Sequence, residues 1–399
     1  MQNILILGAI TLTGALLLYP PLSRAPLWRA TITPLASIIG SGFLVLGPIL
    51  NVNFGGWAPA MMCLLCLAAY AFGSAIRFNI AVIGDTPQDG GPLLERGLEA
   101  ASAWALALAY VVSVAYYLNL FGAFGVTLTD VNDSYHARML TTAVFVMIAL
   151  VGWTRGFSAF ERMEEISVGL KLAIIAGLLV GLGLFFGRTA AAGQLAFAAP
   201  AISGWPAVAL AFGLIVTVQG FETSRYLGAN YDAALRIRSM RLAQGLSTTI
   251  YMIYAVLLAY IFSPGDVALS ETAIIEMMHV VAPILPALLV VAALAAQFSA
   301  AVADTGGSGG LVAELTGGRV SLRQAYAGLV AGGLILTWTS DVFEIISFAS
   351  RGFALYYALQ AGLAAVRAKR TSASLTRRAG YGGLALLGLA IALFGASVE

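Results

Sequence analysis

The stretch that decides the fold is residues 37–48, Ser-Ile-Ile-Gly-Ser-Gly-Phe-Leu-Val-Leu-Gly-Pro. It places the polar triplet Gly40-Ser41-Gly42 in the middle of a segment that is otherwise apolar enough to cross a bilayer. Backbone groups freed from a helix in hydrocarbon are costly, so an interruption persists only where protein or a cavity surrounds it. We therefore expect a helix broken near the membrane midplane, with its freed backbone groups available to a ligand.

The composition indicates an integral membrane protein throughout. Of 399 residues, 60% are hydrophobic and 10% are charged, and the mean hydropathy is +0.90. Apolar stretches approach the roughly 20 residues that a spanning helix needs, and most segments between them are too short to fold alone. A net charge of +2 favours neither nucleic acid nor an acidic partner. The expected spans are 4–19, 30–50, 57–76, 103–125, 139–153, 167–187, 206–226, 245–262, 282–303, 325–338, 342–366 and 380–396.

Basic residues are distributed very unevenly between the two faces of these spans. Of 21 lysines and arginines, eighteen share the face that carries Arg24 and Arg29, two lie on the opposite face, and Arg351 lies within a span. The positive-inside rule places the loop with Arg24 and Arg29 in the cytoplasm. The chain is then expected to be a multi-pass cell-membrane protein with both termini outside the cell. Segment 4–19 lacks a basic start and a cleavage site, so we expect a retained additional helix.

A second interruption occurs in segment 206–226, where Gln219-Gly220 is followed by Glu222. It lies five helices after the first interruption, as an inverted five-plus-five repeat predicts, and the two helices enter from opposite sides. The expected organisation is an additional helix and loop (1–28), a first repeat (29–188), a second repeat (204–366), and a loop with a C-terminal helix (367–399).

Four motifs, in order and spacing, resemble the amino acid/polyamine/organocation (APC) transporter superfamily, which has the leucine-transporter (LeuT) fold. They are Ile39-Gly-Ser-Gly-Phe43, Gly90-Gly91, Val168-Gly-Leu-Lys-Leu172 and Gly220-Phe-Glu222. The resemblance covers roughly residues 28 to 366. It implies an all-α protein of about 12 transmembrane helices, with discontinuous first and sixth core helices. It also implies secondary active transport of an amino acid or related small amine by alternating access.

The resemblance and the physics of helix ends indicate the same substrate site. A substrate carboxylate would bind amides of Ser41, Gly42 and Phe43 at the positive start of the outer half-helix. An ammonium would face carbonyls near both breaks. Alternatively, the glycines only permit close helix packing. The candidate site residues are Ser37, Ile38, Ile39, Gly40, Ser41, Gly42, Phe43, Tyr116, Val218, Gln219, Gly220, Phe221 and Glu222, with Tyr117 and Asn119 as further candidates for the wall.

Lys171 lies inside a span, where ionisable residues are functional candidates because their burial is costly. By resemblance, it occupies the position where some superfamily members put an amine in place of a sodium ion, between the first, fifth and eighth core helices. We expect coupling to protons, by symport or exchange, with Ser299, Asp304 and Thr305 contributing. Lys171 and Asp304 have similar depth and could pair. The alternatives are a lysine that reaches the interface and a solvated aspartate.

Arg351 is expected near the midplane, facing the bundle interior, where it pairs with Glu222 or holds an acidic substrate side chain. The run Gly306–Gly310 is expected to form a flexible cytoplasmic turn, since it lacks the flanking features of a phosphate loop.

Enzymatic function is not expected. The sequence has no nucleophile–base pair, no His-Glu-x-x-His motif and no cofactor fingerprint. Cys63 and Cys66 lie in an apolar span and indicate packing rather than metal or redox chemistry. The expected partners are a small-molecule substrate, protons and the lipid bilayer, without nucleic acid, metal or cofactor. The alternatives are a transporter-like ligand sensor or subunit that does not transport, or a LeuT-fold carrier of a non-amino-acid solute or ion.

Overall fold

The computed structural model describes residues 2–40, 42–84, 92–154, 161–228, 230–266 and 268–398, apart from the side chains of 154 and 161–165. These residues form helices and no strands. Within them, eight helical stretches are long and apolar enough to cross a membrane. Each of the twelve expected spans overlaps a helix, which confirms the all-α membrane fold. Ser41 and Gly90-Gly91 lie outside the described residues.

The first core helix is broken, as expected, and four long helices follow it. Its first half is α3 (Pro26–Ile38) and its second half is α4 (Gly42–Phe54). The next four are α5 (Ala58–Ile83), α6 (Leu93–Val126), α7 (Ser134–Thr154) and α8 (Glu161–Ala191).

The sixth core helix is also broken, and it opens the second set of five. It consists of α9 (Gly204–Gly213) and two 3-10 turns, η3 (Ile215–Val218) and η4 (Phe221–Tyr226). Then follow α10 (Ala233–Ala259), α12 (Leu285–Leu315), α13 (Leu322–Thr339) and α14 (Val342–Arg370). Capping boxes at Ser321 and Asp341 start α13 and α14, because each cap side chain and its N3 partner satisfy first-turn N–H groups.

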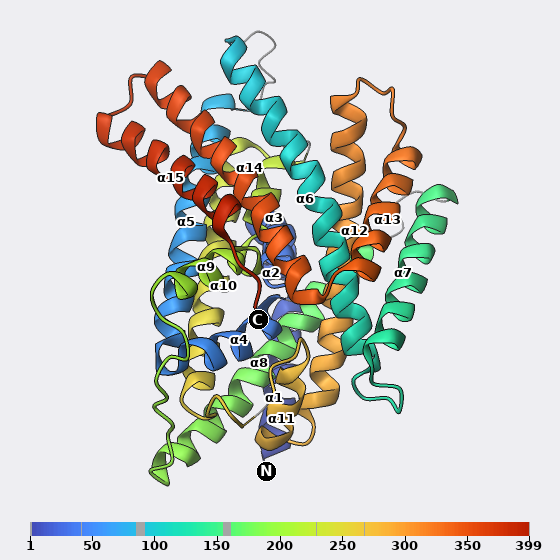
Figure 1. Cartoon of the computed structure of the whole chain (residues 1–399), viewed down its shortest axis with the longest axis vertical. Helices are drawn as coiled ribbons and strands as arrows, with labels where there is room; N and C mark the ends of the chain where they lie inside the picture. Colours follow the sequence, from blue (N-terminus) through green and yellow to red (C-terminus); the bar gives the residue numbers. More distant parts are fainter. Residues whose placement is uncertain are drawn as a thin grey trace.

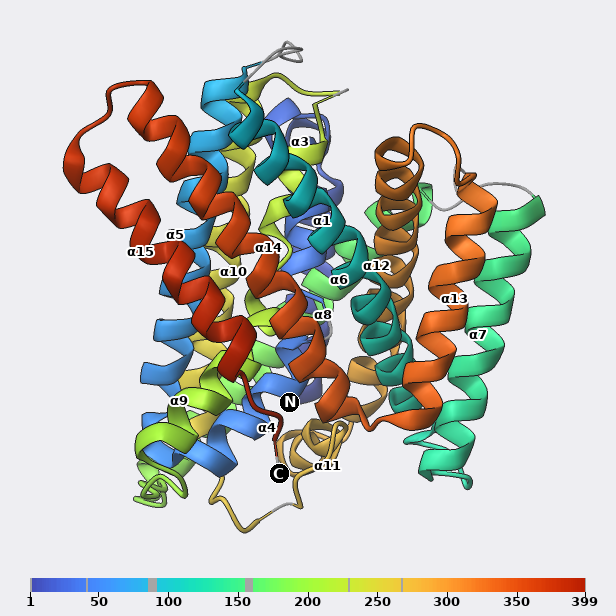
Figure 2. The ribbon, with the colours of Figure 1, turned by 45° about the horizontal axis from the view of Figure 1, so that its top comes forward.

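Further helices surround this core: α1 (Gln2–Leu18), α2 (Pro20–Ser23), η1 (Gly55–Trp57), α11 (Ala273–Val281) and α15 (Leu375–Phe394). Figures 1 and 2 show α7 beside α13 at one edge, and α15 packed along α14 at the other. Helix α6 crosses the centre and packs against both α12 and α14. The repeat boundaries themselves stay a prediction.

The additional helix α1 is packed into the bundle along α8. A Cβ atom on Gly177 would lie 2.6 Å from Ile10 Cγ1, and one on Gly181 would lie 3.2 Å from Ile6 Cδ1. The two glycines, four residues apart, therefore form a groove on α8 that receives two isoleucines of α1.

The expected turn at Gly306–Gly310 is wrong, because these residues continue α12 as helix. Tertiary packing explains the difference. A Cβ on Gly309 would lie 2.3 Å from Tyr326 Cε1, and one on Gly307 would lie 3.1 Å from Tyr110 Cε2. The glycines let these two tyrosine rings approach the helix backbone, and this packing offsets the low helix propensity of glycine.

Candidate functional site

The first break lies between the two halves of the first core helix. Helix α3 ends at Ile38, and Ile39 has non-helical torsion angles (φ −83°, ψ 58°) although its N–H still donates to the carbonyl of Leu35. Helix α4 then begins at Gly42. The last carbonyls of α3 consequently have no donor from a following helical turn, and they must find partners elsewhere.

Two of these carbonyls accept hydrogen bonds from side chains of other helices. Lys171 Nζ in α8 donates to the carbonyl of Ala36 at 2.5 Å, and Tyr251 Oη in α10 donates to the carbonyl of Ile38 at 2.6 Å. Lys171 is 2% exposed. A lysine ammonium at the negative end of a half-helix is electrostatically favourable. Lys171 does not reach towards the interface, and the expected contact between the fifth and first core helices is present.

The second break replaces α-helix by 3-10 turns and one left-handed residue. Gln219 is extended (φ −82°, ψ 177°), and Gly220 has φ +115°. A Cβ atom on Gly220 would lie 2.5 Å from the carbonyl carbon of Ser37 and 2.6 Å from the nitrogen of Ile38. Glycine is required here both by the torsion angle and by the close approach of the two breaks. The structure therefore brings the two predicted interruptions into direct backbone contact.

Close packing also surrounds the start of α4. A Cβ on Gly42 would lie 2.8 Å from Thr217 Cα. The ring of Phe43 packs against Tyr251 and Tyr254, with ring centroids 5.4 and 4.3 Å apart. In this conformation Gly42 serves helix packing, which was the alternative to ligand binding. Carboxylate binding by these amides stays a prediction.

The three wall candidates of the third core helix, α6, differ in their contacts. Tyr117 Oη accepts a hydrogen bond from Gln219 Nε2 at 3.1 Å, whereas Tyr116 is buried and packs beside Tyr117. Asn119 donates to Thr337 in α13 and serves packing between helices. Through this hydrogen bond, Tyr117 connects α6 to the second break.

Glu222 and Arg351 do not form the predicted pair. The fully buried Glu222 accepts hydrogen bonds through Oε2 from Tyr357 Oη at 2.9 Å and from the Gly220 N–H at 3.0 Å. Arg351 is exposed and donates from Nε and Nη2 to the carbonyl of Gly395, at 2.9 and 2.5 Å. The predicted pairing is wrong because Arg351 lies on the face of α14 against which the C-terminal segment packs. Phe221, next to Glu222, is also fully buried and stacks on Tyr357.

The C-terminal segment after α15 turns back onto α9, the first half of the sixth core helix. The N–H of Ala396 donates to the carbonyl of Ala209 at 2.9 Å. A Cβ on Gly213 would lie 1.7 Å from the carbonyl oxygen of Ala396, so only glycine admits the segment there. This contact connects α9 with the end of the chain. The same segment supplies the carbonyl of Gly395 that accepts the hydrogen bonds of Arg351.

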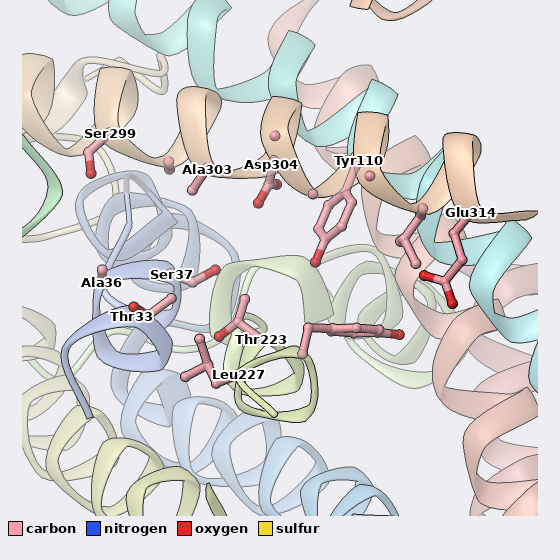
Figure 3. Close-up of a pocket in the computed structure, with 16 residues that line it drawn as sticks. Thr33, Ala36, Ser37, Tyr110, Thr223, Leu227, Ser299, Ala303, Asp304 and Glu314 are labelled. Atoms are coloured by element: carbon pink, nitrogen blue, oxygen red, sulfur yellow. The ribbon is translucent and has the colours of Figure 1, made fainter. Parts of the chain in front are cut away.

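A cavity of about 350 Å³ lies beside the breaks. Its wall comes from α3, α6, η4 with the adjoining Leu227, and α12. Figure 3 shows Asp304 and Tyr110 pointing into this space from one side, with Ser37 and Thr223 opposite them and Glu314 at one end. No lysine, arginine or histidine occurs among the described residues of the wall.

The predicted coupling residues on α12 have different surroundings. Ser299 lines the cavity, as does Asp304, which is 4% exposed and accepts a hydrogen bond from Ser113 Oγ. Thr305 is buried and donates to the carbonyl of Ala301 in its own helix, at 2.6 Å. The pairing of Lys171 with Asp304 stays a prediction.

A buried charge network near the start of α6 was not predicted. Arg367 in α14 donates to Glu95 Oε2 at 3.3 Å and to Glu99 Oε2 at 3.1 Å, and Arg225 in η4 also pairs with Glu99. Arg225 donates further to Gln360 at 2.6 Å. The network connects three helices that lie far apart in sequence. In the sequence, only the four-residue spacing of Glu95 and Glu99 indicates this network, because it puts both carboxylates on one helix face.

Comparison with known proteins adds two findings. A family model described as APC superfamily transporter matches residues 20–395. The chain is also 39% identical over 349 residues to a protein of Aquifex aeolicus (strain VF5) described as uncharacterized. That alignment covers 86% of this chain and 84% of the Aquifex protein.

Proposed function

Because this chain belongs to the APC superfamily of transporters, we propose that it moves an amino acid or related small amine across the cell membrane by alternating access, coupled to protons. The observation that carries this proposal is the contact of Lys171 Nζ with the freed carbonyl of Ala36. A buried ammonium at that place supplies a positive charge to the end of the broken helix without a sodium ion. Unlike a sodium ion, a lysine side chain can accept and release a proton, so we place the proton coupling of the proposed cycle at Lys171.

Unequal packing on the two sides of the breaks supports alternating access. On one side, the cavity extends from Glu314 and Leu227 to Ala36 and Ser37, next to the first break. On the other side, Phe43 is buried against two tyrosines of α10. A site with an open approach from one side and packed side chains on the other is what one state of an alternating-access cycle requires.

The direction of this opening follows from the charge distribution. In this proposal, the loop with Arg24 and Arg29 faces the cytoplasm by the positive-inside rule, and both termini are outside. The cavity is lined by the half of α3 that follows this loop, so it opens towards the cytoplasm. The protein is then described in an inward-facing state.

Flux measurements with the purified, full-length protein in proteoliposomes test the proposal. Uptake of labelled amino acids and amines is compared under a proton gradient, a sodium gradient and no gradient. We expect uptake that follows the proton gradient, does not require sodium, and is lost in Lys171→Ala. The matched control is Lys369→Ala, because Lys369 is the other lysine of the chain and is exposed at the end of α14.

Two results would contradict the mechanism. Sodium-dependent uptake without pH dependence, or unchanged coupled uptake in Lys171→Ala, would remove Lys171 as the coupling group. Binding without any uptake would instead indicate a ligand sensor.

A further inference from the structure

A groove of about 440 Å³ lies between the additional helix α1 and the core helices α3 and α8, and we call it the α1 groove. Among the described residues, its wall is apolar, with Ser23 as the one hydroxyl and no charged side chain. Leu18 is 80% exposed and Ile166 is 73% exposed, so the groove opens at the surface of the bundle. Its α1 wall precedes residues 20–395, which match the family model. The groove therefore depends on a helix outside the family-matched part of the chain.

The groove exists because small residues line it on both α1 and α8. Near the start of α1, isoleucines pack onto two glycines of α8, as described above. One turn after Ile10, the position that would continue the isoleucine row is Gly14, and the α8 wall contains Gly169 and Ala173. A Cβ on Gly14 or on Gly169 would have no described atom within 4 Å. The missing side chains therefore leave a space that a ligand can fill.

Two arginines flank the α1 groove where α2 leads into α3. Arg24 directly follows the wall residue Ser23, and Arg29 directly follows the wall residue Trp28. Both arginines are exposed, and neither has an ion pair with a residue that the structure describes. In the orientation proposed above, this end of the groove lies at the cytoplasmic membrane surface. Arginines at such a place attract anionic lipid headgroups, and tryptophan favours the same depth.

An apolar wall with positive charge at one end matches a phospholipid that has a negative headgroup. The aliphatic side chains and glycines accommodate an acyl chain. Moving that chain from the surrounding lipid into the groove gains little hydrophobic energy, because lipid tails are as apolar as the wall. The selectivity for one lipid class must therefore come from the arginines. A polar solute has little to bind here, since the described wall offers it one hydroxyl.

We propose that the α1 groove binds one anionic phospholipid, with an acyl chain between α1 and α8 and the headgroup at Arg24 and Arg29. A volume of about 440 Å³ is in the range of small-ligand sites. Helices α3 and α8, which both line the groove, are also the helices that the contact between Lys171 and Ala36 joins. The bound lipid therefore packs against both helices and holds α1 to them. The α1 groove shares no wall residue with the cavity beside the breaks.

Native mass spectrometry of the purified, full-length protein in detergent tests the proposal, because it counts bound lipid molecules. The two probes are palmitoyl-oleoyl phosphatidylglycerol and palmitoyl-oleoyl phosphatidylcholine, which share their acyl chains and differ in headgroup charge. We expect one molecule of phosphatidylglycerol to bind at least about tenfold more tightly than phosphatidylcholine, because two arginines lie near the headgroup.

Filling the groove should remove this site. Gly14→Leu combined with Gly169→Leu places two side chains in the open space, and this variant should fold because leucine favours helix more than glycine does. We expect its affinity for phosphatidylglycerol to fall at least about tenfold. The matched control is Gly8→Leu in α1, because the added Cβ also meets no described atom within 4 Å and the residue lies outside the groove wall. This control should bind phosphatidylglycerol as the unchanged protein does.

Removing the positive charge should remove the selectivity. Arg24→Gln and Arg29→Gln should each weaken phosphatidylglycerol binding about fivefold and leave phosphatidylcholine binding unchanged. Arg319→Gln, the same change at an exposed arginine outside the groove wall, is the control and should alter neither affinity.

Two results would overturn the proposal. The first is equal binding of the two lipids. The second is full phosphatidylglycerol binding by the protein with Gly14→Leu and Gly169→Leu, even if the arginine variants bind less, because the lipid would then lie on the surface and not in the groove. The measurement uses neither substrate nor flux, so its failure leaves the proposed transport standing, and absent transport leaves the lipid site standing.

Discussion

Substituting Gly220 by alanine tests whether the contact between the two broken helices stabilises the fold. Gly220 has φ +115°, and a Cβ there would lie 2.5 Å from the carbonyl carbon of Ser37 and 2.6 Å from the nitrogen of Ile38. Both are backbone atoms at the end of α3, so no side chain can rotate away. Relief requires the two breaks to separate.

The expected cost has two parts. A left-handed conformation costs a residue other than glycine about 1–2 kcal/mol, and overpacking in a well-packed interior costs about 1–3 kcal/mol. Gly204 separates the two parts, because its φ is +64° while no atom lies within 4 Å of its added Cβ. Gly204→Ala should therefore lower the free energy of unfolding by about 1–2 kcal/mol. Gly220→Ala should lower it by about 2–5 kcal/mol in total.

The assay is reversible unfolding of the purified protein in mixed micelles with a denaturing detergent, followed by ligand binding on the folded fraction. We expect Gly220→Ala to lower both the free energy of unfolding and ligand affinity, and Gly204→Ala to lower only the former. Equal losses of stability in the two variants would refute the reasoning, because they would show that the contact at Ser37 adds nothing.

Three further predictions concern polar and charged side chains. Tyr357→Phe should lower the free energy of unfolding by about 1–3 kcal/mol, because it removes a donor from the buried Glu222. A double-mutant cycle with Glu222→Gln should show a coupling energy of about 0.5–3 kcal/mol. Strictly additive losses would exclude this hydrogen bond. Arg351→Ala should lower the free energy of unfolding by only about 0–1 kcal/mol, because the side chain is exposed. It should nevertheless speed amide exchange near the C-terminal end of the chain. Its loss of stability should add to that of Glu222→Gln. Glu95→Ala should lower the free energy of unfolding by about 1–3 kcal/mol, because the buried Arg367 loses one acidic partner and keeps the other, Glu99. Unchanged chemical unfolding of this variant would contradict the structure of the charge network.

The sequence by itself determined the spans and both breaks, because these are local properties of the chain. Apolar length decides whether a segment crosses a bilayer, and the polar glycine triplet at 40–42 and the Gln219-Gly220 pair interrupt helices where they stand. The depth of Lys171 followed in the same way from its place along a span. Its contact with the first core helix agreed with the family resemblance.

Only the tertiary structure decided which side chains meet. Successive helical residues point about 100° apart, so a small error in the rotation of a helix about its axis changes which side chains meet. Arg351 thus meets the carbonyl of Gly395, 44 residues later in the chain, while Glu222 meets Tyr357. The glycine run 306–310 is helical because tyrosines from two other helices pack on it. The acidic cavity likewise exists only where four separate segments converge, and no local pattern in the sequence specifies that convergence.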